Sequence, residues 1–278
     1  MRSALITGAS TGIGHATALR LDAAGWRVFA GVRREEDAEA LRQAGSDRLR
    51  PLILDVTEAE QIAAAAAQVE AEAGGLEGLV NNAGVAIPAP LETVPIEDLR
   101  RQIEVNLIAQ VAVTQALLPS LRRAHGRVIF IASIGGRIAF PMNGPYHMAK
   151  FGVEAAGDVF RQELRPWRIP VSIVEPGSIA TPIWERGART AEEVQERAGS
   201  RQEALYGQAM ERLREVARDL AERGIPPEKV ADAIEHALTA KRPRSRYLVG
   251  LDAKVQARLK PLIPTPLFDR IVARMMGL

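Results

Sequence analysis

Short apolar runs alternate with longer amphipathic stretches along most of this chain of 278 residues. The runs are Ala4–Ile6, Val28–Val32, Leu52–Leu54, Leu79–Val80, Val128–Ala132 and Val171–Val174. Because each run is apolar throughout instead of alternating with polar residues, it predicts a strand that is buried on both faces. Strands separated by helices in this way are typical of an α/β chain with a doubly wound parallel sheet and helices on both faces.

Several of the expected helices have recognisable ends. Thr57 followed by Glu60 is typical of a capping box at the start of a helix over Glu58–Glu72, and Gly74-Gly75 would end that helix. The first and second helices are expected to end in the same way at Gly25 and Gly45.

The length and composition favour a single domain over residues 1–278, since 47% of the residues are hydrophobic and no flexible linker divides the chain. Residues 185–223 are charged and favour helix, so we expect a helical insertion that covers the substrate site as a lid. A helix over Pro226–Ala240 and a strand over Arg246–Gly250 would bring the sheet to about seven strands. Residues 251–278 form a C-terminal tail.

The tail contains one amphipathic segment from Pro266 onward. Leu267, Ile271 and Met275 fall on one stripe of a helix, with charged residues elsewhere. We expect this stripe to dock on its own protein or on a partner subunit. Contact with a membrane surface is the alternative.

The composition excludes several classes of function. The 36 basic and 34 acidic residues nearly balance, so nothing predicts nucleic-acid binding. The chain has no cysteine, and its four histidines, at positions 15, 125, 147 and 236, are too scattered to predict a metal site. The N-terminus lacks the pattern of a signal peptide and no segment is apolar enough to span a bilayer, so a cytoplasmic protein is expected.

The first apolar run leads into a glycine-rich segment, Thr7-Gly8-Ala9-Ser10-Thr11-Gly12-Ile13-Gly14, directly before the helical stretch Ala16–Ala24. Glycines let the backbone turn tightly beside a pyrophosphate, and the N-terminus of a helix offers free N–H groups to it. Such a turn also fits an ordinary connection between strand and helix. The strand before it and the helix after it favour a dinucleotide site.

Tyr146 and Lys150 are four residues apart, so on a helix their side chains share one face. Taken alone, this spacing is more typical of a surface pair. A phenol titrates near pH 10, and lowering its pKa towards neutrality requires about 4 kcal/mol of phenolate stabilisation. A lysine ammonium one helical turn away is suited to supply part of that.

Together these segments resemble the short-chain dehydrogenase/reductase family, over about the first four-fifths of the chain. The family's motifs occur here in the family's order: the wide glycine spacing G-x-x-x-G-x-G, Asn81-Asn82-Ala83-Gly84, Asn106, Ser133, the Y-x-x-x-K of Tyr146 and Lys150, and Pro176-Gly177 with Thr181. The stretch Leu164–Gly177 is similar to the hydroxysteroid, retinol and 3-hydroxybutyrate dehydrogenase branch. The resemblance implies a Rossmann fold and hydride transfer between a nicotinamide cofactor and a carbonyl or secondary alcohol.

The resemblance also implies roles for four catalytic residues. Tyr146 would exchange a proton with the substrate oxygen, and Ser133 would hold the same oxygen. Lys150 would act on the phenol and bond the nicotinamide ribose, and Asn106 would help to seat a water that connects Lys150 to solvent. As alternatives, Ser133 is a simple strand-end hydroxyl and Asn106 a buried amide satisfied within its own helix.

The implied cofactor contacts are spread over the whole motif set. They comprise Gly8, Ser10, Thr11, Gly12, Ile13, Gly14, Arg33, Arg34, Asp55, Val56, Asn82, Ala83, Gly84, Tyr146, Lys150, Pro176, Gly177, Ile179 and Thr181. Arginines stand where an acid usually grips the adenosine ribose, so we expect a preference for NADP(H), with NAD(H) possible. As alternatives, Arg33 and Arg34 are solvated or compete with Glu35 and Glu36, and Asp55 caps the next turn.

Mostly apolar segments are expected around the reacting carbon. They are Val85–Leu91, Ile138–Met142 and Ile183-Trp184, together with Leu205, Tyr206, Met210 and Leu213 on the insertion. They indicate a lipophilic substrate, such as a steroid or retinoid, bound at Ser133, Tyr146 and Trp184. Packing on the sheet or on a second subunit is the alternative. A homodimer or homotetramer is expected from the family, and a catalytically silent NADPH-binding sensor or scaffold is the alternative function.

Overall fold

The structure is a computed structural model that describes all residues from Met1 to Leu278. Its centre is a parallel sheet of seven strands in the order β3-β2-β1-β4-β5-β6-β7. The strands are β1 (Ser3–Ile6), β2 (Arg27–Val32), β3 (Leu49–Ile53), β4 (Gly78–Asn81), β5 (Arg127–Ile131), β6 (Val171–Pro176) and β7 (Arg246–Val249). Every predicted strand is present, and the predicted doubly wound α/β fold is confirmed.

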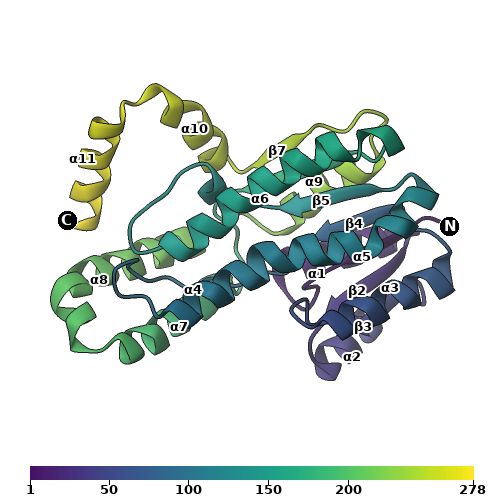
Figure 1. Ribbon diagram of the computed structural model, residues 1–278, viewed down its shortest axis with the longest axis horizontal. Helices are drawn as coiled ribbons and strands as arrows, with labels where there is room; N and C mark the ends of the chain where they lie inside the picture. The colour runs from purple at the N-terminus through teal and green to yellow at the C-terminus, as the bar shows by residue number, and fades with distance from the viewer.

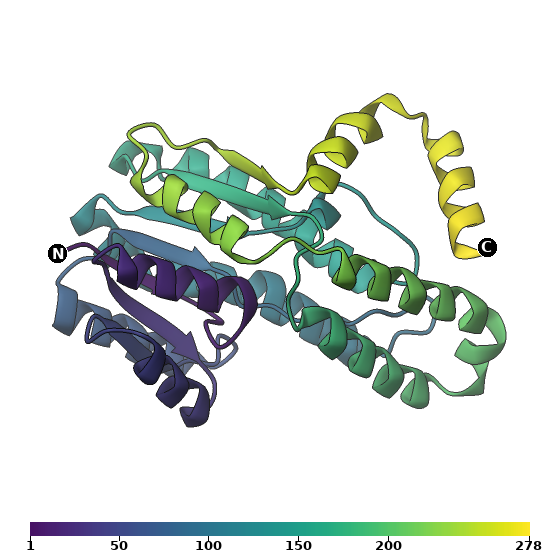
Figure 2. The ribbon, with the colours of Figure 1, turned by 180° about the vertical axis from the view of Figure 1, so that it is seen from behind.

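Helices cover both faces of the sheet (Figures 1 and 2). One face carries α3 (Ala59–Ala73), α5 (Ala109–Ala124) and α6 (Gly144–Glu163). The other carries α1 (Gly12–Ala23), α2 (Glu35–Ala44) and α9 (Glu228–Thr239). The strand order reverses between β1 and β4, and in such sheets ligands bind outside the carboxyl ends of the strands at this point.

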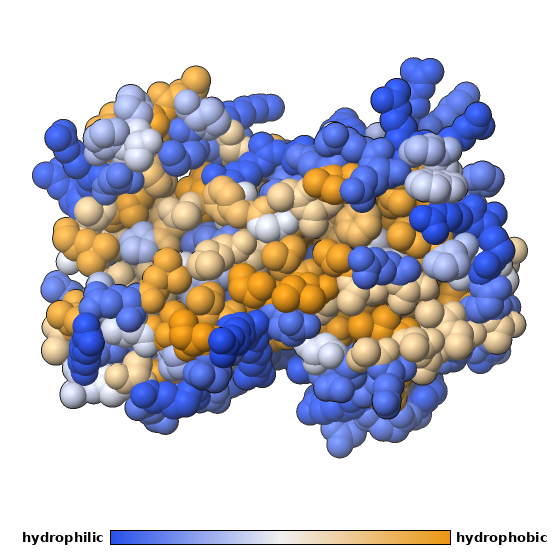
Figure 3. Space-filling model, viewed as in Figure 1, coloured by the Kyte–Doolittle hydropathy of each residue, from blue (hydrophilic) through white to orange (hydrophobic).

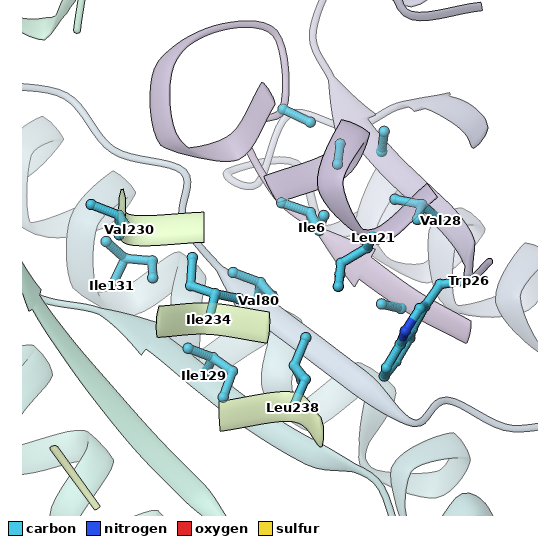
Figure 4. Packing of buried hydrophobic residues seen from close by; sticks show 14 of the residues in the cluster. Ile6, Leu21, Trp26, Val28, Val80, Ile129, Ile131, Val230, Ile234 and Leu238 are labelled. Carbon is cyan, nitrogen blue, oxygen red and sulfur yellow. The ribbon is translucent and has the colours of Figure 1, made fainter. Parts of the chain in front are cut away.

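Each face of the sheet has its own apolar core. In Figure 4, Leu21 of α1 and Ile234 and Leu238 of α9 pack on strand residues such as Ile6 and Val80. A second cluster, which includes Phe29 and Phe130, fills the opposite face. The edge strands differ from the prediction that all strands are apolar throughout: Arg50 and Ile53 of β3 are exposed because no strand and little helix surface covers that edge.

The predicted capping box at Thr57 is wrong. Thr57 donates its hydroxyl to Oδ1 of Asp55, at 2.8 Å, and α3 starts two residues later without a side-chain cap. The Thr57 hydroxyl bonds the Asp55 carboxylate, two residues earlier, instead of the backbone N–H of Glu60, three residues later. The predicted end of α3 is confirmed, because Gly74 has a φ of 68°, a conformation that suits glycine.

The remaining helices lie beyond the carboxyl ends of the strands (Figures 1 and 2). They are α4 (Ile96–Ile103), α7 (Ile183–Ala198), α8 (Ser200–Glu222), α10 (Leu251–Leu259) and α11 (Thr265–Met276). A π-helical turn, Glu104–Ile108, joins α4 to α5, and Lys260–Leu262 form a short 3-10 turn between α10 and α11. No helix is both long enough and apolar enough to cross a lipid bilayer.

Helix α11 docks on α8, but not through the predicted stripe. Phe268, Val272 and Met276 pack against Met210 of α8, in a cluster separate from the two sheet cores. Leu267, Ile271 and Met275 are about half exposed, so the expectation that they dock on their own protein is wrong. Both stripes have a spacing of four residues along the helix. The stripe that contains Phe268 faces α8, and the stripe that contains Leu267 faces solvent.

Candidate active site

The carboxyl ends of four neighbouring strands bring the predicted site residues to one edge of the sheet. The glycine-rich turn follows β1, Asn82 and Ala83 follow β4, Ser133 follows β5, and Gly177 follows β6. Tyr146 and Lys150 lie on α6, which packs across β5 and β6. The topology thus gathers residues that are up to about 170 positions apart in the sequence.

The glycine-rich turn lies so close to other backbone segments that a side chain at its glycines would have no room. Gly8 and Gly12 have φ values of 66° and 57°, and a Cβ on Gly8 would lie 2.8 Å from the Cα of Ala83. A Cβ on Gly14 would collide with the carbonyl oxygen of Gly8 and the amide of Asn82. Helix α1 starts here, and Thr11 caps it without a side-chain bond, so its first N–H groups are available to an anion.

Side-chain hydrogen bonds tie this turn to the end of β4. The Thr7 hydroxyl accepts from the backbone N–H groups of Asn82 and Ala83, at 3.0 and 2.9 Å. In return, Nδ2 of Asn82 donates to the carbonyl oxygens of Thr7 and Gly8, at 2.9 and 3.0 Å. Thr7 was not predicted as a site residue, although its place at the end of the strand is a signal for this role.

The loop after β6 reaches the same turn. A Cβ on Gly12 would lie 3.0 Å from Cγ2 of Thr181, so the first glycine turn and the Pro176–Thr181 loop face each other. Trp184 donates its indole N–H to the carbonyl oxygen of Ile179 at 2.8 Å. The indole therefore connects the start of α7 to this loop.

The two arginines after β2 differ in their surroundings. Arg34 forms a bidentate pair with Asp37, with both N–O distances at 3.0 Å, and this pairing lowers the pKa of Asp37. Arg33 is exposed and makes no ion pair. Glu36 stands 3.7 Å from Arg34, and Glu35 pairs with Arg42. The prediction that nearby carboxylates compete for the charge of Arg34 is therefore confirmed. The main competitor is Asp37, which was not predicted.

Asp55, at the end of β3, caps its turn. Its Oδ1 accepts from the N–H of Thr57 at 3.0 Å and from the Thr57 hydroxyl. Val56 beside it is buried. The structural alternative for Asp55 is thus confirmed.

Tyr146 and Lys150 stand one helical turn apart on α6, with the ammonium 5.7 Å from the centre of the phenol ring. Burial raises the pKa of Tyr146, and a hydrogen bond with Ser133 lowers it. Burial also lowers the pKa of Lys150 to about 8, while the charge of Glu154 raises it. Since burial disfavours the phenolate, Tyr146 keeps its proton until further positive charge is brought beside it.

Lys150 is held by the sheet and not by the phenol. Its Nζ donates to the carbonyl oxygen of Ile131, at 2.8 Å. Ser133 follows directly after β5, and its Oγ accepts from the N–H of Gly135 at 3.0 Å. One backbone bond each therefore positions the lysine and the serine.

Asn106 is fully buried in the π-helical turn. Its Oδ1 accepts from the N–H of Val85 at 2.8 Å, and its Nδ2 donates to the carbonyl oxygen of Val85 at 2.9 Å. The alternative that its amide is satisfied within its own helix is wrong, because the partner lies 21 residues earlier. A π turn disrupts the regular helical bonding and is frequent at functional sites.

Two polar residues that the sequence did not single out hold the same loops. Gln102 accepts from the N–H of Ile87 at 2.8 Å and fixes the segment after β4. Asp252 of α10 accepts from the N–H of Ser178 at 2.7 Å, just after Pro176-Gly177. Neither lies in a motif, so the sequence carries no signal for these roles.

A partly buried charge cluster lies near Lys150, around the fully buried carboxylate of Glu175. Arg246 of β7 bonds Glu154 and Asp158 of α6, at 3.0 and 2.7 Å, and Glu175 of β6, at 3.1 Å. Arg137 also pairs with Glu175, at 2.7 Å. Burial and the charge of Glu175 raise the pKa of Glu154 to about 7, while Arg246 lowers it. The cluster connects the helix that carries Tyr146 to the strand that ends at Pro176.

Most of the apolar residues expected around the substrate pack on one another. Met142 and Met210 are buried in the cluster that also includes the inward face of α11. Ile87 and Ala89 are buried in a smaller cluster against α7. Leu205 is 54% exposed, so it does not line an interior pocket. These apolar residues are therefore covered by one another and by α7, α8 and α11, and not by the sheet.

Comparison with known proteins identifies the family. Residues 2–192 match the short chain dehydrogenase family. The 17-beta-hydroxysteroid dehydrogenase type 6 of Homo sapiens is 41% identical over 283 residues, covering 97% of this chain and 87% of the relative. Retinol dehydrogenase 5 of Mus musculus is 39% identical over 275 residues, covering 96% and 86%.

Solved structures agree with this. A short chain dehydrogenase from Burkholderia cenocepacia in complex with NADP has a TM-score of 0.76 and 26% identity, covering 97% of this chain and 98% of that one. A short-chain dehydrogenase from Streptomyces avermitilis has a TM-score of 0.74 and 31% identity, covering 94% and 95%. The chain therefore belongs to the short-chain dehydrogenase/reductase family of oxidoreductases, in its hydroxysteroid and retinol dehydrogenase branch.

Proposed function

We propose that this protein is an NADP(H)-dependent oxidoreductase that interconverts a secondary alcohol and a carbonyl group, with Tyr146 as general acid and base. One observation carries the proposal: the Tyr146 phenol is partly buried next to Ser133 and lies one helical turn from the buried ammonium of Lys150. All three groups stand at the carboxyl edge of the sheet, beside the glycine-rich turn.

The residues present fit a dinucleotide. The N–H groups at the start of α1 and the side-chain-free backbone of Gly8, Gly12 and Gly14 suit a pyrophosphate. Asp55 and the small residues Ala83 and Gly84 would border the adenosine, and Thr181 would border the carboxamide. When bound, the nicotinamide supplies or accepts the hydride and brings a positive charge in its oxidised form.

The chain's own residues would move the proton. In the reduction direction, the Tyr146 hydroxyl gives its proton to the substrate oxygen, and in the oxidation direction the phenolate takes it back. The Ser133 hydroxyl holds the same oxygen. The Lys150 ammonium stabilises the phenolate in the interval, because a charge inside the protein acts more strongly than one in water. Asn106, which holds the segment after Gly84, would help to seat a water that connects Lys150 to solvent.

Arg33 supports the preference for NADP(H). It is exposed at the end of β2 and has no carboxylate partner, so its guanidinium is available to a 2′-phosphate. Arg34 would contribute less, because Asp37 already occupies both arms of its guanidinium. The Burkholderia cenocepacia neighbour was crystallised with NADP, which agrees with this preference.

A lipophilic substrate fits the surroundings of Tyr146. Val85 of the loop after β4 and Phe140 of the loop after β5 are only partly buried at the edges of their apolar clusters. Trp184 at the start of α7 is also only partly buried. Relatives named for hydroxysteroids and retinol support a steroid-like or retinoid-like alcohol or ketone. Helices α7 and α8 would act as the lid over this site.

An exposed apolar surface on α5 and α6 supports a homo-oligomer. Met148, Phe151 and Val159 of α6, together with Ile108 at the start of α5, are exposed, and apolar residues cover the middle of the view in Figure 3. Pairing of these helices with a second copy would bury them. A dimer or tetramer, a single-domain chain and a cytoplasmic location stay predictions.

Replacing Tyr146 with phenylalanine tests the mechanism. The variant should lose turnover by about 10²-fold or more, since it lacks the proton donor, while NADPH binding followed by tryptophan fluorescence persists. Tyr247→Phe removes a hydroxyl that bonds only His236 and the backbone of Arg244, and it should stay active. Full activity in Tyr146→Phe would refute the mechanism. Wild-type protein that binds NADPH but turns over no member of a broad alcohol and ketone panel would favour the sensor or scaffold.

A further inference from the structure

The two C-terminal helices carry an apolar surface that the rest of the chain leaves uncovered. Its members are between 41% and 77% exposed: Leu251, Val255 and Leu259 on α10, Leu262 in the connection, and Leu267, Ile271, Met275 and Leu278 on α11 and at the terminus. We call these residues the C-terminal apolar surface. Figure 1 shows the two helices projecting from the body of the protein, and Figure 3 shows apolar atoms among hydrophilic ones in this region.

Basic residues border this surface in the same pattern on both helices. Lys254 and Arg258 directly precede Val255 and Leu259, and Arg270 and Arg274 directly precede Ile271 and Met275. On a helix, this spacing places positive charges along one side of each apolar stripe. All four cations are exposed, and Asp269 is the only exposed acid on these helices.

These four cations also lack the partners that other arginines have. On the lid, Arg197 pairs with Asp98, and Arg201 pairs with Glu92. No ion pair involves any of the four basic residues on α10 and α11. Unpaired positive charge beside exposed aliphatic side chains is the chemistry that complements an anionic lipid surface.

We propose that the C-terminal apolar surface docks on an anionic lipid bilayer. The aliphatic side chains would enter the boundary between headgroups and acyl chains, and the lysine and arginines would reach the phosphates with their long side chains. The helices lie on the bilayer in this arrangement and do not span it.

A second copy of this chain is a poorer occupant for the surface. A two-fold contact puts the same patch on both subunits, so it would bring Lys254, Arg258, Arg270 and Arg274 of one copy against those of the other. Such like-charge contacts oppose association. The uncharged side chains exposed on α5 and α6 offer a better surface for a second copy.

The docking surface is connected to the substrate side of the molecule. The ring centres of Phe268 and Phe140, which lies in the loop after β5, are 6.1 Å apart. The Nζ of Lys260 lies 4.4 Å from the centre of the Phe268 ring. Val272 and Met276 pack on the lid helix α8. Docking would therefore place the lid at the lipid surface, where a lipophilic alcohol or ketone is concentrated. This consequence rests on the proposed function, whereas the docking itself does not.

Vesicle sedimentation tests the proposal with the full chain. Wild-type protein should bind vesicles of equal phosphatidylglycerol and phosphatidylcholine, and should bind vesicles of phosphatidylcholine alone more weakly. Each basic side chain near an anionic surface strengthens binding about fivefold, so Arg270→Gln with Arg274→Gln should weaken it about 30-fold. Leu267→Ser with Ile271→Ser should weaken binding about tenfold or more on both vesicles, since half of each side chain remains to be buried.

Matched controls separate the surface from general effects. Arg212→Gln with Arg218→Gln removes two exposed charges from α8, and Ile53→Ser with Ile96→Ser removes two exposed apolar side chains elsewhere. Both controls should bind vesicles like wild type. Failure of the wild type to bind anionic vesicles, or equal binding by the Leu267 and Ile271 variant, would overturn the proposal. A loss of the oligomer in that variant with unchanged vesicle binding would instead identify a subunit interface and also overturn it.

Turnover of a small water-soluble ketone separates this proposal from the proposed function. The Leu267 and Ile271 variant should reduce such a ketone at the wild-type rate, because neither side chain contacts the site. Vesicle binding by a wild-type protein without any turnover would remove the oxidoreductase mechanism and leave the docking surface in place.

Discussion

Replacing Glu154 with glutamine should move the alkaline limb of the pH profile for ketone reduction to lower pH. Lys150 is buried with a pKa of about 8, and the negative charge of Glu154, one helical turn further along α6, raises that pKa. Without this charge the ammonium is less stable, so Lys150 loses its proton at a lower pH. Because the charged lysine supports the phenolate of Tyr146, turnover should then fall at a lower pH as well.

The expected size of this shift follows from the geometry. Two charges about 6 Å apart, as for side chains one helical turn apart, interact by about 3 kcal/mol at an effective dielectric constant of about 20. That interaction corresponds to about two pH units. Arg246 donates to the same carboxylate at 3.0 Å and offsets part of its charge, so we expect a shift of about one unit.

The assay is kcat/KM for a water-soluble ketone, followed by nicotinamide absorbance across the pH range in which Lys150 titrates. The fold should survive, because Arg246 retains Asp158 and Glu175 as partners in Glu154→Gln. Glu163→Gln is the matched control, since it removes an exposed carboxylate from the same helix, more than three turns from Lys150, and should leave the profile unchanged. An alkaline limb that stays in place in Glu154→Gln, or moves to higher pH, would refute the reasoning.

Two further substitutions test the cofactor site. Arg33→Asp should shift the ratio of KM values from NADPH towards NADH by about tenfold or more, because a charge-assisted bond to phosphate is replaced by repulsion. Arg34→Asp should change the ratio less, and an unchanged ratio in Arg33→Asp would show that the phosphate lies elsewhere. Gly14→Ala should weaken NADPH binding at least about tenfold and lower Tm, since its Cβ meets the Gly8 carbonyl and the Asn82 amide. Gly74→Ala adds a Cβ in open space and strains only its own positive φ, so it should cost about 1 kcal/mol without changing binding, and equal binding losses would contradict the close approach at Gly14.

The sheet and the glycine-rich turn were predictable because their signals are local. A buried parallel strand requires a continuous apolar run, and Val28–Val32 or Val128–Ala132 meet that requirement with no knowledge of their neighbours. Thr57 shows the limit of local signals. Its hydroxyl had two partners within reach in the sequence, the N–H ahead of it and the Asp55 carboxylate behind it, and only the backbone path decides between them.

The tail shows a second limit. Leu267, Ile271 and Met275 have the same spacing as Phe268, Val272 and Met276, so periodicity identifies two stripes of equal merit. Which stripe is buried depends on the surface of α8 against which the helix packs. The sequence therefore predicts an amphipathic helix but not the direction in which its apolar faces point.

Two of the residues that no motif revealed lie in the same part of the chain. Arg246 and Asp252 lie beyond residue 192, where the match to the family ends, yet they hold Glu154, Glu175 and Ser178 across as many as 92 residues of sequence. Their ion pairs and hydrogen bonds position the loop after β6 against the helix that carries Tyr146. Because residues outside the family match supply these contacts, β7 and α10 are expected to adjust the pKa of Lys150 and the nicotinamide side of the site. A change in α10 or β7 can therefore alter the chemistry while every motif residue stays in place.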